Sequence, residues 1–253
     1  MPQGSRTRLK TPLGPELALP PPFTLVTLRE LGDAFAHAIS LADKQGAGTL
    51  VHVGRFDLAE FALVLEPEEP LRLARRAFYA GMTALIDALA AHAQPETAIS
   101  VDWPDAIFLN LGLIGGGRLA WPDGASEDEA PPWLVFGALI RTASMTGEDP
   151  GSHLRSTDLA EEGFSELSSG QLVESFARHF MVAVDGWQEQ GFGAVAKTYL
   201  PRLAAAKGVR RDLDDNGDLL VRRMDTAEVE RHALLPRLAV PSWLDPATRE
   251  PRL

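Results

Sequence analysis

The stretch from Val101 to Trp121 has the sequence VDWPDAIFLNLGLIGGGRLAW. An apolar run follows the Trp103-Pro104 pair, and Asn110-Leu111-Gly112 is typical of a tight reversal between two strands. Three consecutive glycines, Gly115 to Gly117, weaken packing inside a strand. They are typical of positions where the backbone twists sharply or where a ligand approaches closely. The stretch therefore predicts a strand, a turn, a strand, a hairpin and a further strand.

The chain on either side predicts helices that alternate with short strand pairs. Thr27 and Glu30 match a capping box, which predicts a helix from Thr27 to about Asp43. The other expected elements are strands at 49–53 and 60–65 joined by Gly54 to Asp57, a helix from Pro70 to about His92, strands at 97–101 and 133–142, loops at 122–132 and 144–156, and helices at 172–187 and 193–200. This alternation predicts an α+β fold with a mixed, mainly antiparallel sheet flanked by helices.

The C-terminal part predicts a small β module. Asn216-Gly217 lies between two β-rich runs, 208–211 and 218–223, and is a strong hairpin signal. Further short strands are expected within 229–234, and we expect the tail to pack back through Trp243. The chain thus divides into an extended lead-in (1–22), a main domain (23–203) and a β-rich C-terminal module (204–253).

Composition excludes several classes of protein. The 253 residues include no cysteine, which removes disulfides, thiolate metal sites and a cysteine nucleophile. The net charge of −11 opposes binding to a nucleic-acid backbone. No apolar run is long enough to span a membrane, and Met1 to Pro22 lacks the apolar core of a signal peptide. We expect a cytoplasmic protein with neither nucleic-acid nor membrane partners.

The central stretch resembles the biotin/lipoate protein ligases. That family has a Lys-Trp-Pro-Asn-Asp motif, then a short hairpin, a lysine and a small Ala-Gly pair. Here the same frame has Asp102-Trp103-Pro104-Asp105-Ala106, the hairpin, Leu113 and Gly115-Gly116. The likeness extends from about Thr24 to Leu200. It implies the fold of the ligase catalytic domain, followed by the small β module of biotin ligases.

The resemblance also implies a ligand pocket along this stretch. In the ligases the region lines the pocket for the acyl-adenylate, so Trp103 would form an apolar wall, beside Gly115, Gly116 and Gly117. Arg118 would hold a carboxylate or phosphate. The alternative is that Trp103 belongs to the core and the glycines only bend a sheet. Of the loop that folds over the adenylate in the family, only Gly54-Arg55 remains, and Arg55 is a further candidate.

The residue that matches the catalytic lysine is Leu113. A buried ammonium would stabilise the negative charge that develops during adenylation. The chain has four lysines, Lys10, Lys44, Lys197 and Lys207, of which Lys44 is a weak candidate to replace it. Arg55 and Arg118 are cationic but do not give up a proton. ATP and Mg²⁺ are expected as cofactors if ligase activity is retained, and no other cofactor is expected.

Two acidic clusters leave alternatives open. Asp102 and Asp105 could share Mg²⁺ across the Trp-Pro turn, or accept backbone amides, which is favoured for Asp105. The run from Asp212 to Gly217 matches the first half of a calcium loop, but Arg223 stands where a glutamate is needed, so we expect a hairpin instead.

Two functional hypotheses follow. The first is a ligase-like protein that binds a small carboxylic acid, such as biotin, lipoate or a related acid, or its adenylate, with an acyl-carrier-type domain as its protein partner. Ordinary ligase activity is not expected, because Leu113 replaces the lysine. The second is a non-catalytic binding or interaction module on the same scaffold.

Overall fold

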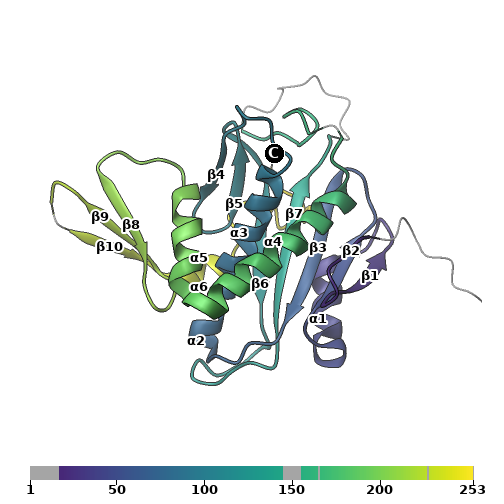
Figure 1. Ribbon diagram of the computed structural model, residues 1–253, viewed down its shortest axis with the longest axis horizontal. Helices are drawn as coiled ribbons and strands as arrows, with labels where there is room; N and C mark the ends of the chain where they lie inside the picture. Colours follow the sequence, from purple (N-terminus) through teal and green to yellow (C-terminus); the bar gives the residue numbers. More distant parts are fainter. Residues whose placement is uncertain (1–16, 145–154, 165, 227, 253) are drawn as a thin grey trace, which may run out of the picture.

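A seven-stranded sheet forms the centre of the molecule (Figure 1). The computed structural model describes residues 17–144, 155–164, 166–226 and 228–252. In spatial order the strands are β1 (Thr24–Leu28), β2 (Thr49–Val53), β3 (Leu58–Leu65), β7 (Leu134–Arg141), β6 (Gly112–Ala120), β5 (Ala106–Leu109) and β4 (Ile99–Asp102). β1 and β2 run parallel, and the remaining neighbours run antiparallel. The predicted fold class is therefore confirmed.

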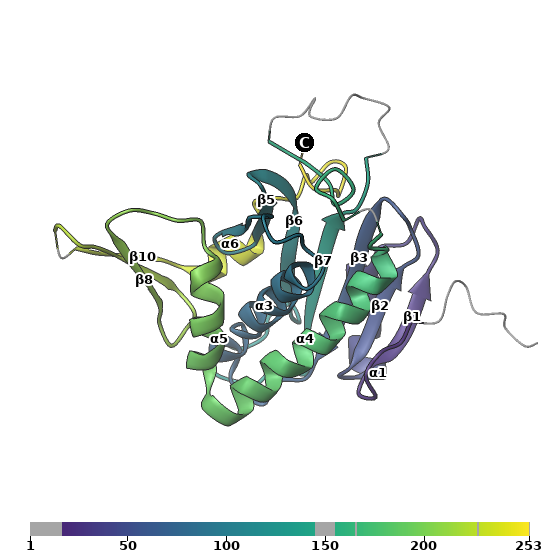
Figure 2. The same cartoon turned by 45° about the horizontal axis from the view of Figure 1, so that its top comes forward.

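Helices cover both faces of this sheet (Figure 2). Helix α1 (Ala34–Gln45) lies on one face, against β2, β3 and β7. Helices α3 (Ala77–Ala90) and α4 (Ser169–Gln190) lie on the other and contact each other along their length. The shorter helical segments are α2 (Leu71–Ala74), α5 (Phe192–Tyr199), the 3-10 turn η1 (Leu200–Arg202) and α6 (Leu234–Ala239).

The main core lies between the sheet and the pair α3 and α4. Phe136 of β7 stacks on Phe176 of α4, with ring centroids 5.7 Å apart. Gly81 of α3 lies directly under Phe136, where a Cβ atom would come within 2.4 Å of the ring. The close approach of α3 to the sheet therefore depends on this glycine.

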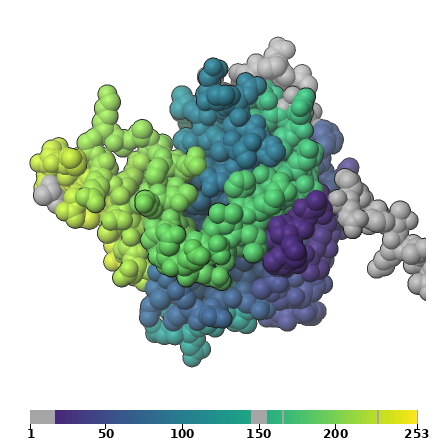
Figure 3. Space-filling view, viewed as in Figure 1, coloured from purple at the N-terminus to yellow at the C-terminus, as the bar shows by residue number. Residues whose placement is uncertain are grey.

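A three-stranded sheet, β8 (Val209–Leu213), β9 (Leu219–Arg223) and β10 (Val229–His232), projects from one side of the main body (Figure 3). Asn216-Gly217 forms the turn of the β8–β9 hairpin, as predicted. After α6, residues 240–252 return to the main sheet. Trp243 is only 1% exposed there, which confirms that the tail packs back through this side chain.

The predicted hairpin between β5 and β6 is also confirmed. Asn110 and Leu111 have φ angles of 45° and 78°, the left-handed conformation that a two-residue reversal of this kind requires. Asn110 stabilises the turn, because its Oδ1 accepts a hydrogen bond from the Ala98 amide at 3.0 Å.

Two predicted helices differ from the structure. The expected capping box at Thr27 is wrong, because Thr24–Leu28 is strand β1 and Thr27 pairs with His52. Helix α1 begins only at Ala34, where the Asp33 side chain accepts the Ala36 amide. The helix expected from Pro70 to His92 is divided into α2 and α3. The lead-in 1–22 and the loop 144–156 fall largely on residues 1–16 and 145–154, which lie outside the described residues.

Candidate functional site

The predicted site residues on β6 do not share one face. A Cβ atom on Gly117 would meet Met82 of α3 and Phe136, so Gly117 faces the main core. Side chains alternate along a strand. Gly116 and Arg118 therefore point to the opposite face, the one that carries α1. Leu113 joins this face as well, because it packs with Leu58 and Leu139.

Arg118 is buried at the start of α1. Its guanidinium carbon lies 4.1 Å from the centroid of the Phe35 ring, and its Nη2 atom lies 3.6 Å from Oδ1 of Asp33. The side chain is 16% exposed, and its Nε atom has no hydrogen-bond partner within the described part of the chain. Burial lowers the pKa of Arg118, while Asp33 and Glu60 act against that shift. Arg118 thus keeps an unused, buried Nε donor in a largely buried side chain.

Two carboxylates occupy the N-terminus of α1. Glu60 is 7% exposed, and its Oε1 atom accepts the Ala34 amide at 2.8 Å. Asp33 accepts the Ala36 amide at 2.9 Å. Burial raises the pKa of Glu60, although the hydrogen bond from Ala34 opposes this. Glu60 and Asp33 thus occupy two of the early amides of α1.

Two further arginines, Arg55 in the connection between β2 and β3 and Arg141 in β7, contact the C-terminal segment. Arg55 donates from Nε to Oδ1 of Asp57 at 2.8 Å, and its Nη2 atom lies 3.3 Å from Oε1 of Glu250. Arg141, at the end of β7, is 9% exposed and donates from Nη2 to the Pro251 carbonyl at 2.7 Å. Arg141 is not among the residues predicted from the sequence. A charged residue that closes an otherwise apolar strand is the signal that could have identified it.

The C-terminal segment covers the glycines. The Trp243 ring lies so close to Gly116 that a Cβ atom there would be 2.5 Å from Nε1, and this Nε1 donates to the Gly117 carbonyl at 3.1 Å. The ring packs among Leu58, Ala106, Leu113 and Leu139. Gly115 has a different role, in the backbone conformation of β6. Its φ angle is 146°, and a Cβ atom at this position would collide with the Leu139 carbonyl.

Asp105 anchors this segment. Its carboxylate accepts the Ser242 amide at 2.9 Å and the Ser242 hydroxyl at 2.8 Å. Burial raises the pKa of Asp105 to about 6, and the hydrogen bonds from Ser242 oppose the shift. The expected role as an acceptor of backbone amides thus fits better than magnesium. Asp102 is exposed, and no group of three or more metal-binding side chains occurs among the residues that the structure describes.

Trp103 lies away from Arg118, so the predicted pocket that contains both is corrected. Its Nε1 donates to the Tyr79 hydroxyl of α3 at 3.1 Å, and its ring centroid lies 6.1 Å from that of His232 in β10. Both contacts are on the side of α3 and the small sheet. Trp103 thus joins α3 to the small sheet.

The lysines in the described part of the chain are all exposed and do not lie beside Arg118. Leu113 is 8% exposed and apolar in its surroundings. Lys44 is exposed near the C-terminal end of α1, whereas Arg118 lies at the start of this 12-residue helix, about 15 Å away along its axis. Lys197 and Lys207 are exposed in α5 and before β8. Lys44 as a replacement for the ammonium stays a prediction that this position does not favour.

The acidic run in the small sheet has a structural role. Oδ1 of Asp214 accepts the amides of Asn216 and Asp218, both at 2.9 Å. Arg231 pairs with Asp214 at 2.9 Å and with Asp218 at 2.7 Å. The hairpin interpretation thus fits, since these carboxylates already have partners.

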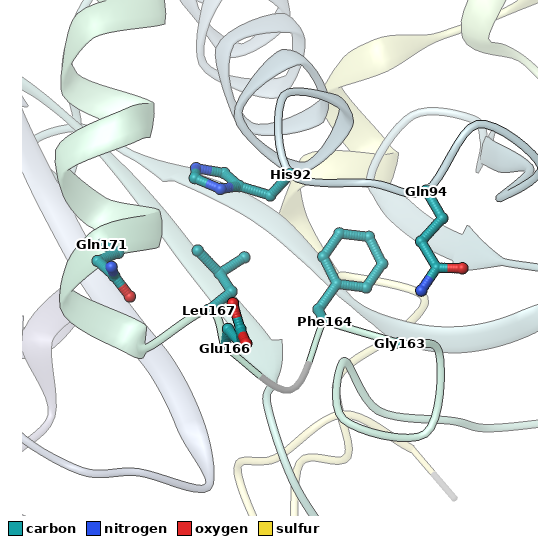
Figure 4. Close-up of a pocket in the computed structure, with 7 residues that line it drawn as sticks. All are labelled: His92, Gln94, Gly163, Phe164, Glu166, Leu167 and Gln171. Atoms are coloured by element: carbon teal, nitrogen blue, oxygen red, sulfur yellow. The ribbon is translucent and has the colours of Figure 1, made fainter.

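Two hollows lie on the opposite side of the sheet. One, of about 920 Å³, lies between the ends of β1 and β2 and the start of α4, and it includes His52 and Arg55. His52 is 6% exposed, and burial lowers its pKa to about 4, so its ring is neutral at pH 7. The other, of about 510 Å³, is shown in Figure 4, where His92 and Gln94 lie opposite Phe164 and Leu167. It contains no predicted site residue.

The comparisons with known proteins agree with the predicted resemblance. Residues 19–201 match the family model described as the biotin/lipoate A/B protein ligase family. The chain belongs to this family. No curated protein sequence matches the chain.

Solved structures extend the family assignment. A biotin protein ligase-like protein of unknown function from Silicibacter sp. TM1040 is 26% identical, with a TM-score of 0.75, over 88% of this chain and 99% of that one. The biotin protein ligase from Aquifex aeolicus is 15% identical, with a TM-score of 0.63, over 83% and 95%. That from Leishmania major in complex with biotinyl-5-AMP is 16% identical, with a TM-score of 0.53, over 85% and 99%. At these identities, the two ligases show a shared fold.

Proposed function

We propose that this family member binds a small apolar carboxylic acid, or its adenylate, on the sheet face that carries α1. The observation that carries the proposal is Arg118, a buried guanidinium with an unused Nε donor beside Phe35. A guanidinium in a site of low dielectric binds a carboxylate strongly. Arg55 and Arg141 supply further positive charge at the other end of the face.

Relatives support the ligand class. The Aquifex aeolicus enzyme has been solved in complex with biotin and ATP, and the Leishmania major enzyme in complex with biotinyl-5-AMP. An acyl-carrier-type protein domain would be the corresponding partner. No helix in the described part of the chain is both long and apolar enough to cross a membrane, and the expected cytoplasmic location stays a prediction.

The residues present do not fit ordinary ligase chemistry with ATP and Mg²⁺. The connection that could cover a nucleotide is short, and its Arg55 is already paired with Asp57. Leu113 supplies no ammonium, and the described residues contain no cluster for a metal. We therefore expect binding of the acid without adenylation.

A non-catalytic interaction module is the second candidate. The observation that favours it is Trp243, which fills the apolar part of the face with the chain's own segment. If this cover is permanent, the face is a structural core and binds no small molecule.

Calorimetric titration distinguishes the two functions. Octanoate, lipoate and biotin are titrated into the protein, with Arg118→Gln as the test variant and Arg178→Gln, on exposed α4 surface, as its control. We expect one of the acids to bind the wild type and the control, and to bind Arg118→Gln at least tenfold more weakly, because a charged hydrogen bond contributes about 1.5–3 kcal/mol. If no acid binds, or if Arg118→Gln binds equally well, the proposal is wrong.

A pyrophosphate assay tests the chemistry separately. With biotin, ATP and Mg²⁺ present, we expect no release of pyrophosphate above the level without protein. Biotin-dependent turnover would contradict the argument from Leu113.

A further inference from the structure

The C-terminal segment, residues 240–252, presents an aromatic ring and a carboxylate to the candidate site. An antiparallel bridge joins Leu244 to Pro251, and the Arg252 amide donates to the Trp243 carbonyl at 2.8 Å. The two ends of the segment therefore lie side by side on the sheet face. Trp243 comes from one end and Glu250 from the other.

The ring occupies the apolar part of the face. Trp243 contacts side chains from β3, β5, β6 and β7 and covers Gly116. Because Gly116 has no side chain, a flat apolar group can lie directly on the β6 backbone. This is the kind of surface that an apolar acyl group would need.

The carboxylate occupies the cationic part. Glu250 lies 3.3 Å from Arg55, and the neighbouring Pro251 carbonyl accepts a hydrogen bond from Arg141. Arg249 lies 3.6 Å from Asp33, the acidic partner of Arg118. The segment thus contacts Arg55 and Arg141, and it contacts Asp33, the acidic partner of Arg118.

Two ion pairs and several buried contacts hold the segment on the face. The Glu250 side chain is 46% exposed and that of Arg249 is 76% exposed, so solvent screens both ion pairs. The buried attachments are the Trp243 ring, the two hydrogen bonds from Ser242 to Asp105, and the hydrogen bond from Arg141 to the Pro251 carbonyl. The segment must break these contacts to leave the face.

We propose that residues 240–252 act as an internal substitute for an apolar carboxylic acid, and that this segment must leave the face before an external acid binds. Trp243 takes the place of the acyl group, and Glu250 takes the place of the carboxylate. This inference rests on the proposed function and adds a means of regulating it.

A reversible lock tests the inference in the full chain. The variant Asp105→Cys/Ser242→Cys places two thiols where the side chains now touch, and the natural chain has no cysteine that could compete. Octanoate and lipoate are titrated into the oxidised and the reduced protein, after mass spectrometry has confirmed the disulfide. We expect the oxidised form to bind at least tenfold more weakly than the reduced form of the same variant.

A second variant tests the role of the Glu250 carboxylate. In Glu250→Gln the substitute carboxylate is removed, with Glu189→Gln on α4 as the control. We expect a two- to fivefold gain in affinity for the acid, about the energy of an exposed ion pair. Hydrogen exchange of the Ser242 and Arg252 amides is expected to become faster when the acid is added.

The outcomes separate the two proposals. Equal binding by the oxidised and reduced forms, with slow exchange retained in residues 240–252, overturns the substitute while the proposed function stands. If no form of the protein, including Glu250→Gln, binds an acid, both proposals are overturned.

Discussion

The carboxyl group of Asp105 has an unfavourable environment for its charge, in spite of two hydrogen bonds. Burial raises its pKa to about 6 in the folded chain, whereas the ordinary value is near 3.8. A carboxyl with a raised pKa favours the folded state most at low pH, and this advantage is lost as the pH rises through about 6. A shift of two units corresponds to about 3 kcal/mol as an upper bound.

We expect Asp105→Asn to remove this pH dependence. Relative to wild type, the variant is expected to gain up to about 2 kcal/mol of stability between pH 4 and pH 7, because the wild type loses stability over this range. Urea unfolding at several pH values measures the difference. Parallel curves at all pH values would contradict the assigned environment.

Gly116 and Gly186 can be compared by the same substitution, because one is crowded and the other is open. A Cβ on Gly116 would lie 2.0 Å from the Asp105 carbonyl, whereas one on Gly186 in α4 would meet nothing within 4 Å. We expect Gly116→Ala to cost more than about 2 kcal/mol and Gly186→Ala to add about 0.5–1 kcal/mol of stability. Chemical denaturation of both variants tests this, and similar effects would be evidence against the tight contact with Trp243.

At the scale of elements, the start of α1 shows where local sequence misleads. Thr27 and Glu30 have the spacing of a capping box, but the β-branched run around Thr27 pairs with β2 instead. A parallel edge strand depends on a partner distant in sequence, which local spacing does not encode. By contrast, Asn110-Leu111-Gly112 and Asn216-Gly217 form the predicted turns, because their conformation is set within a few residues.

Substitution at the two competing caps tests this assignment. We expect Asp33→Ala to cost about 1 kcal/mol, because Asp33 accepts the Ala36 amide and also lies near Arg118. Glu30→Ala, at an exposed position, is expected to change stability by less than about 0.5 kcal/mol. Thermal unfolding measures both. A larger loss of stability from Glu30→Ala than from Asp33→Ala would favour a helix that begins at Thr27.

In the candidate site too, the sequence indicates the local features but not the contacts between distant segments. The family frame identifies β6, and alternation along a strand separates Gly116 and Arg118 from Gly117. Neither indicates that Trp103 joins α3 and the small sheet, or that Trp243 covers Gly116, since these contacts bring together distant segments. Arg141 was missed for the same reason, as its partner is the Pro251 carbonyl.

At the scale of the whole molecule, the small sheet is tied to the main body at its hairpin. The Tyr79 hydroxyl donates to the Gly217 carbonyl at 2.5 Å, and Arg76 donates to the Asp215 carbonyl at 3.1 Å. Residues 240–252 add the second link, through Asp105 and Trp243. The small sheet and the C-terminal segment are thus each tied to the main body by buried contacts.

We therefore expect the chain to unfold in one cooperative transition. Far-ultraviolet circular dichroism reports the helices, and near-ultraviolet dichroism reports the aromatic core, so the two transitions should coincide. Tyr79→Phe, which removes the link to Gly217, is the test of coupling and should lower the midpoint without dividing the curve. Two resolved transitions in the wild type would contradict this coupling.

The indole of Trp243 has a further use in the laboratory. It is only 1% exposed, and its N–H donates to the Gly117 carbonyl. Indole emission moves to longer wavelength when water reaches the ring. The difference spectrum between the wild type and Trp243→Phe would therefore isolate this one chromophore among the five tryptophans and follow its hydration in real time, without an attached dye.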